Sequence, residues 1–279
     1  MFDLPISEII AFLSVLIIYS AASILGVLQL FSQGHSYNKP LSILVIFGLG
    51  VELLILILRA VELEAVPLTG LFESLILLTI VFGLVYLFSS LSIRQIWFGS
   101  IMVWVILAMN ILAAVVAAPT AEPEPLAQTP WAIVHAVAMV FGGTCVSFSM
   151  ATAFLFLLGR RKLKHKQVMN VLGRVPNLQK LERMNLLGIQ LAFLFITVGI
   201  ISGLAMVFAV DMGVLSWLAD AKVIFTIAVW AVLMLILILN NVFVLQGRTR
   251  GYITIIAFAL ILFAIFGVTI LGVTQHRFS

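Results

Sequence analysis

Eight long apolar segments, separated by short polar connections, restrict the fold of this chain more than any other feature. A helix needs about 20 mainly apolar residues to cross the hydrocarbon core of a bilayer. Only 9% of the residues are charged, whereas soluble domains carry roughly a quarter, and the mean hydropathy is +1.27. We therefore predict an all-α polytopic membrane protein. Its eight expected transmembrane helices are approximately 8–31, 42–60, 70–91, 96–118, 130–158, 187–210, 221–245 and 251–273.

The distribution of lysine and arginine predicts how these helices are oriented. The connection 159–186 holds eight of the fifteen basic residues. Because basic connections remain on the cytoplasmic side, we predict that 159–186 is a basic cytoplasmic loop. Alternation then places both termini on the outer, periplasmic side, together with the outer tryptophan-containing loop 211–222. Four further basic residues fall on the inner side: Lys39, Arg94, Arg248 and Arg250.

Common soluble catalytic and metal-binding motifs are missing from the sequence. The single cysteine, Cys145, lies within an apolar segment, where it can form neither an internal disulfide nor a cysteine metal site. The sequence also has no phosphate-binding glycine loop, serine-hydrolase elbow or zinc-protease helix. Any function must therefore come from side chains arranged on a membrane scaffold.

Three ionisable residues lie within or at the ends of the second and third predicted helices. Glu52 is in mid-span, and Arg59 follows seven residues later, which is close to two helical turns and predicts a shared face. Glu73 falls in the first turn of the third helix, where the helix dipole favours a carboxylate. We predict that Glu73 caps its helix and pairs with Arg59. The alternative is that Glu73 orients a molecule bound at the outer surface.

Two histidines lie at the predicted outer boundary. His135 begins the fifth helix and His276 follows the eighth, whereas His35 and His165 fall on the inner side. Two neutral imidazoles on one face can occupy both axial positions of a haem iron. The loop 211–222 lies between them in sequence. We therefore predict that His135 and His276 are axial ligands of a haem.

Aromatic and basic residues near these histidines could complete such a site. A porphyrin needs a flat apolar wall, which Trp217 and Trp131, with Met212 and Phe208, could supply. Haem propionates need cationic partners, and Lys222 and Arg277 are the outer cations nearest to the loop and to His276 in sequence. The alternative is that both cations anchor helix ends at the membrane interface.

Several motifs resemble the cytochrome c assembly (CcsA/CcmC/HemX) family of membrane proteins, which handle haem. The resemblance covers nearly the whole chain, as a single transmembrane domain (1–279). It is closest to the CcsA branch and its shorter HemX-like or YpjD-like relatives. By that resemblance, His135 and His276 are the external ligands of haem b. The matching segments are Pro67–Leu75, Trp131–His135, Gly199–Gly203, Gly247–Gly251, Gly267-Val268 and His276.

The chain departs from the family pattern in the outer loop and in one helix. Trp217, Asp220 and Lys222 match the family loop, but Met212 and Ala219 stand where tryptophan is expected. The transmembrane histidine of the CcsA branch is also absent near Ile238. This pattern favours the HemX-like relatives over a complete cytochrome c synthase.

The resemblance implies a haem-handling protein for cytochrome c biogenesis in the bacterial inner membrane. Implied partners are haem, apocytochrome c, a CcsB-like membrane subunit and the lipid bilayer, with no nucleic acid. The chain is not expected to be an enzyme by itself, and at most forms part of a cytochrome c haem-lyase complex. Two alternatives remain: a regulator or scaffold of haem biosynthesis that acts through 159–186, and a solute or proton transporter that uses Glu52 and Glu73.

Overall fold

The computed structural model of this chain is all-helical throughout the residues that it describes. These are 4–31, 37–63, 70–93, 95–118, 129–164, 177–209, 213–243 and 245–267. Eight of the helices are long and apolar enough to cross a membrane, which confirms the predicted multi-pass architecture. The orientation of the termini remains a prediction.

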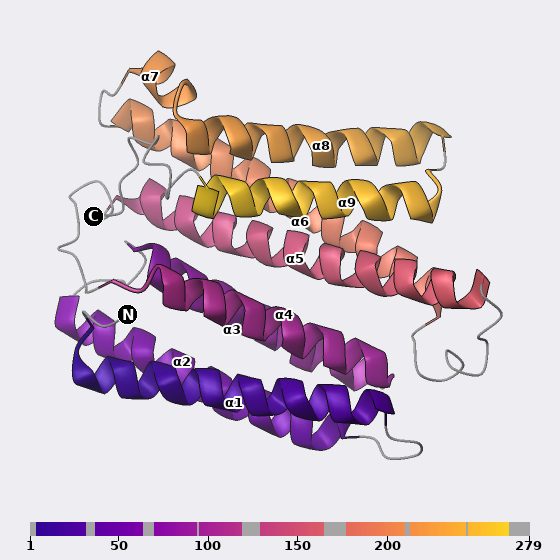
Figure 1. Ribbon diagram of the computed structural model, residues 1–279. Coiled ribbons are helices and arrows are strands. Elements are labelled where there is room, and N and C mark those ends of the chain that lie inside the picture. Colours follow the sequence, from indigo (N-terminus) through magenta and orange to yellow (C-terminus); the bar gives the residue numbers. More distant parts are fainter. Residues whose placement is uncertain are drawn as a thin grey trace. The chain divides into compact units, whose positions relative to one another are not determined.

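The eight long helices follow the predicted apolar segments in order (Figure 1). Their bounds are α1 (Ile6–Phe31), α2 (Asn38–Leu63), α3 (Leu71–Ser92), α4 (Ile96–Val115), α5 (Pro130–Lys164), α6 (Leu178–Ala209), α8 (Ala221–Phe243) and α9 (Gly247–Leu262). A short helix, α7 (Val214–Leu218), precedes α8, and a π-helical turn, η3 (Phe263–Gly267), continues α9.

The helices that flank the basic loop are longer than the apolar pattern predicted. Helix α5 continues to Lys164 instead of ending at 158, and α6 begins at Leu178 instead of 187. Hydropathy detects only the part of a helix that suits the bilayer, whereas backbone hydrogen bonding continues into the polar flanks. Leu178 and Leu181, within the predicted loop 159–186, therefore belong to α6.

Two compact units divide the chain. Unit 1 comprises Met1–Glu122 and Leu158–Lys180, and unit 2 comprises Pro123–Leu157 and Leu181–Ser279. In unit 1, the helices α1 to α4 form a ring in which α1 packs on α2, α2 on α3, α3 on α4 and α4 on α1 (Figure 1). This is the neighbour pattern of an up-and-down four-helix bundle.

A polar contact joins α1 to α4 near the end of α1. Gln29 is fully buried and donates through Nε2 to Ser100 Oγ (2.8 Å), and its Oε1 accepts from the backbone N–H of Tyr37 (3.2 Å). Ser100 Oγ in turn donates to the carbonyl of Gly26 at 2.8 Å. Hydrogen bonds between helices and small interfacial residues are the usual means of association where lipid removes the hydrophobic driving force.

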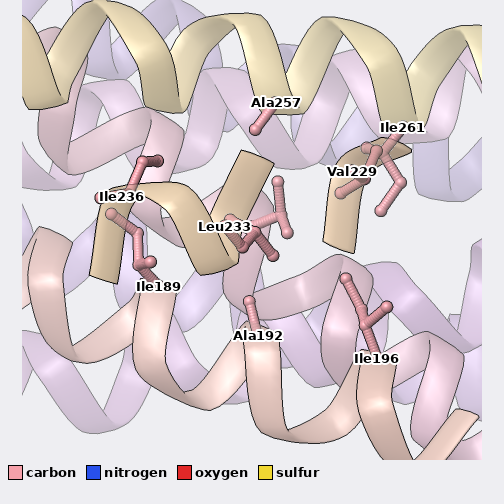
Figure 2. Close-up of a cluster of buried hydrophobic side chains, with 9 residues drawn as sticks. Ile189, Ala192, Ile196, Val229, Leu233, Ile236, Ala257 and Ile261 are labelled. Carbon is pink, nitrogen blue, oxygen red and sulfur yellow. The ribbon is translucent and has the colours of Figure 1, made fainter. Parts of the chain in front are cut away.

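Unit 2 has an apolar core formed by α5, α6, α8 and α9 (Figure 2). In Figure 2 the labelled side chains of α6, α8 and α9 point toward one another. The nine core residues are Val146, Ile189, Ala192, Ile196, Val229, Leu233, Ile236, Ala257 and Ile261. Glycines bring α5 and α6 close together, because a Cβ on Gly142 would lie 2.8 Å from Ile196 and one on Gly199 would lie 2.6 Å from the Met139 sulfur.

A buried arginine joins three helices of unit 2 near the start of α9. Arg250 pairs with Glu182 of α6 (Nη2 to Oε1, 3.1 Å) and donates to Asn240 of α8 (Nη1 to Oδ1, 2.7 Å). The sequence placed Arg250 only as a topology-setting charge. The structure shows that it also connects α6, α8 and α9.

Candidate functional site

The start of α5 positions His135 through a well-formed helix N-terminus. Thr129 Oγ1 accepts a hydrogen bond from the backbone N–H of Ala132 (3.2 Å), and Pro130 occupies the first helical position. Threonine at the N-cap followed by proline is a strong helix start, because the hydroxyl satisfies an amide that the helix leaves without a partner. His135 consequently lies in the second turn of α5.

A backbone carbonyl of α6 determines the tautomer of His135. The His135 Nδ1 atom lies 2.7 Å from Gly199 O, and because a carbonyl can only accept, Nδ1 carries the proton. The lone pair of the neutral imidazole is then on Nε2. Histidines that bind metals usually donate their other ring N–H to a carbonyl or carboxylate in this way. The arrangement therefore suits an Nε2 ligand of iron.

Gly203 is the point where His135 and Trp217 both approach α6. A Cβ at this position would lie 3.1 Å from His135 Nδ1, 3.2 Å from His135 Cε1 and 3.5 Å from Trp217 Cζ2. Any residue with a Cβ at this position would push against the imidazole of His135, so glycine is the residue that fits here. The structure thus brings together one predicted ligand and one predicted aromatic wall residue that are 82 positions apart in sequence.

Trp217 lies on α7, a helix that the sequence analysis did not expect. The segment 211–222 was predicted to be a loop, but Val214–Leu218 is helical and Trp217 is only 7% exposed. The backbone N–H of Trp217 donates to Gly213 O (3.2 Å), and that of Asp220 donates to Trp217 O (3.1 Å). These bonds close one compact turn, which holds the indole beside Gly203.

Asp220 caps the start of α8. Its Oδ1 accepts from the backbone N–H of Lys222 at 2.8 Å, and its own carbonyl accepts the first helical bond from Ile224 (3.0 Å). The Asp220 side chain is buried, with 5% exposure. A carboxylate at this position accepts from a backbone N–H that the helix leaves without a partner, and the positive end of the helix dipole stabilises its negative charge. Asp220 therefore has a structural role in orienting α7 and α8.

Removing the cap should destabilise unit 2 modestly. Asp220→Ala is expected to lower the free energy of unfolding by about 0.5–2 kcal/mol, whereas Asp220→Asn should retain most of the stability because asparagine also caps well. Thermal unfolding of the detergent-solubilised protein, followed by circular dichroism, measures both. If Asp220→Asn were as damaging as Asp220→Ala, the negative charge and not the cap would be the essential feature.

Four other predicted site residues remain, and the structure describes two of them, Trp131 and Lys222. Trp131 lies in the first turn of α5 and is 48% exposed. His276 and Arg277 lie outside the described residues. Lys222 is in the first turn of α8, where its backbone N–H binds Asp220.

Arg59 and Glu73 form the predicted ion pair at one end of unit 1, and the structure adds a third member. Arg59 Nη1 donates to Glu73 Oε1, while Nε and Nη2 donate to Glu8 Oε2 at 3.1 and 2.8 Å. Arg59 Nη2 also donates to Ala118 O at 2.8 Å, just beyond α4. Arg59 thus connects all four helices of the ring, and its side chain is fully buried.

Sequence reasoning missed Glu8, Gly203 and Glu182 as partners. Glu8 lies in the first turn of an apolar helix, so its acidic character was visible but its partner was not. Gly203 was part of a recognised motif, but a glycine has no side chain from which its packing partners could be predicted. Only the tertiary arrangement identifies the roles of these three residues.

The fold and these polar contacts define a multi-pass helical membrane protein, which carries a histidine and a tryptophan held against one glycine. A family model described as "Cytochrome C assembly protein" matches residues 68–276 of the chain. The chain therefore belongs to the cytochrome c assembly protein family. The matched region includes His135, Gly203, Trp217 and His276, while Glu8 and Arg59 precede it. Comparison with curated proteins found no match.

Proposed function

We propose that this protein holds haem b on the outer face of the bacterial inner membrane during cytochrome c biogenesis. Membership of the cytochrome c assembly family indicates a role in that process. The observation that carries the more specific proposal is the hydrogen bond from His135 Nδ1 to Gly199 O beside the buried indole of Trp217. His135 and His276 would be the axial ligands.

The residues present fit a haem in their chemistry. A neutral imidazole with its Nδ1 proton donated to a carbonyl is a suitable iron ligand. Trp217 and Trp131 would contribute aromatic surface, and Lys222 and Arg277 would receive the propionates. Asp220 would act through its cap on α8, which positions Lys222. These residues would bind and orient the group rather than react with it.

The chemistry of thioether formation would come from the haem vinyl groups and the thiols of apocytochrome c. The chain's own contribution would be to position the haem and to limit its exposure to water. Apocytochrome c and a CcsB-like membrane subunit are the proposed partners. Within the family, we propose that the chain belongs to the CcsA branch or its HemX-like relatives, because its outer loop retains only Trp217, Asp220 and Lys222 of the pattern.

His135→Ala should abolish the bis-histidine haem spectrum. We would purify the wild type and the variant in detergent, add haem, and record oxidised and reduced visible spectra. The wild type is expected to show a low-spin spectrum, and His135→Ala and His276→Ala are each expected to lose it because one axial ligand is missing. His165→Ala, in the basic loop, is the matched control and should resemble the wild type.

Two results would contradict the proposal. A wild-type protein that takes up no haem would show that the outer loop does not hold it. An unchanged low-spin spectrum in His135→Ala would show that haem binds elsewhere. In the first case, a HemX-like regulator or scaffold that acts through 159–186 would become the better explanation.

A further inference from the structure

A second buried polar cluster lies in the middle of unit 1, far from Gly203 in sequence and unused by the proposed haem site. We define the Glu52 cluster as Tyr19, Glu52, Thr79 and Asn110, one residue from each helix of the ring. Thr79 Oγ1 and Asn110 Nδ2 each lie 2.9 Å from Glu52 Oε1, and the Tyr19 hydroxyl lies 3.3 Å from Oε2. Glu52, Thr79, Asn110 and Tyr19 are all 0% exposed.

The backbone of α2 is shaped to admit Tyr19. Gly48 precedes Glu52 by one helical turn, and a Cβ on Gly48 would lie 2.5 Å from Tyr19 Cζ. The tyrosine ring therefore rests against the α2 backbone, which lets its hydroxyl reach Glu52. Two residues of α2 therefore form the cluster with Tyr19: Glu52 accepts its hydrogen bond, and Gly48 makes room for its ring.

No basic side chain contacts Glu52 among the residues that the structure describes. Of the three side chains that the structure describes in hydrogen-bond contact with Glu52, only Tyr19 is titratable, since Thr79 and Asn110 do not ionise. Arg59 follows on the same helix at about 10 Å along the axis, as seven residues at 1.5 Å each require. Arg59 already binds both Glu8 and Glu73. It therefore supplies no spare charge to Glu52.

An ionised Glu52 would be poorly compensated. Thr79 has a single hydroxyl proton but two nearby acceptors, Ile76 O at 2.8 Å and Glu52 Oε1 at 2.9 Å. If Thr79 donates to Ile76, an anionic Glu52 keeps only two of these hydrogen bonds, a short one from Asn110 (2.9 Å) and a long one from Tyr19 (3.3 Å). A buried carboxylate without a cation is strongly disfavoured, and such groups neutralise themselves by taking up a proton.

We propose that Glu52 is a proton-binding site in the centre of unit 1, occupied as a neutral carboxylic acid. The proton comes from water and forms an O–H bond at Oε1, which donates to Thr79 Oγ1 while Thr79 donates to Ile76 O. Asn110 and Tyr19 then donate to the carboxyl oxygens. In this arrangement each of the three short contacts, Thr79 to Ile76, Thr79 to Glu52 and Asn110 to Glu52, joins one donor to one acceptor. Tyr19 and Glu52 precede the family-matched residues 68–276, whereas Thr79 and Asn110 lie within them.

Infrared spectroscopy tests the proposal directly. We would record spectra of the purified wild type at neutral pH, together with Glu52→Gln, Thr79→Val and Glu62→Gln. The wild type is expected to show the C=O stretch of a protonated carboxyl group, which Glu52→Gln should remove. Glu62 is exposed at the end of α2, so Glu62→Gln is the matched control and should retain the band.

Thr79→Val keeps Glu52 and therefore tests the proposal even if Glu52→Gln does not fold. Thr79→Val removes the proposed acceptor, and the carboxyl band is therefore expected to shift in frequency while remaining present. Absence of a Glu52-dependent carboxyl band would overturn the proposal, as would a carboxyl band whose frequency is the same in Thr79→Val as in the wild type. A Glu52-dependent carboxylate band that responds to replacing sodium with choline would instead identify a metal-cation site.

Discussion

Arg59→Met is expected to lower the free energy of unfolding of unit 1 by about 3–5 kcal/mol, the usual cost of removing one partner from a buried ion pair. Methionine preserves much of the side-chain length but leaves Glu8 and Glu73 buried without a cation. It also removes the donor to Ala118 O and the contact of the guanidinium with the Phe72 ring, 4.5 Å away. Thermal unfolding in detergent measures the loss.

Two further variants separate charge from packing at Arg59. Arg248→Met is the matched control, because Arg248 is exposed and its loss should change stability little. Neutralising all three residues, as Glu8→Gln, Arg59→Met and Glu73→Gln together, should recover part of the stability because no uncompensated charge remains. An Arg59→Met protein as stable as the wild type would contradict the role that we assign to this residue.

Gly203→Val is expected to weaken haem binding by about 10–100-fold, the usual effect of disturbing a residue that orients a metal ligand. This prediction rests on the proposed function. The new side chain would begin 3.1 Å from His135 Nδ1 and extend further toward the imidazole and Trp217. The hydrogen bond to Gly199 O would be lost as the ring moves. Titration of haem into the detergent-solubilised protein, followed by visible absorption, gives the affinity.

Gly50→Val provides the matched control for this substitution. Gly50 is also a helical glycine, but a Cβ there meets no heavy atom within 4 Å. The haem affinity of the Gly50→Val protein should therefore equal that of the wild type. If Gly203→Val bound haem as tightly as Gly50→Val, the contact between Gly203 and His135 would not position the ligand.

Much of the architecture could be predicted from the sequence because the bilayer imposes a simple rule. Backbone groups in lipid must be satisfied within the segment, so each long apolar run has to become a helix. Each of the eight predicted spans coincides with a helix over the residues that the structure describes. The Arg59–Glu73 pair was also predictable, because buried charges in spans pair with one another and few candidates existed.

The candidate site was predictable only in part. His135 and Trp217 were identified as residue types suited to haem, and the structure brings both to Gly203. The helix α7, which buries Trp217, was missed because five residues are too few for a periodic pattern. The structural roles of Asp220 as a cap and of Glu8 as a partner of Arg59 depend on neighbours that a linear pattern does not name.

By itself, the sequence determined the class of the fold, the number and order of the spans, and the residue types available for chemistry. These properties follow from local hydropathy and from the cost of burying charge. The tertiary structure alone decided that His135 donates to Gly199, that Trp217 lies beside Gly203 and that three polar side chains without a positive charge surround Glu52. Each of these contacts joins residues from different helices, and their distance depends on how those helices pack and rotate against one another.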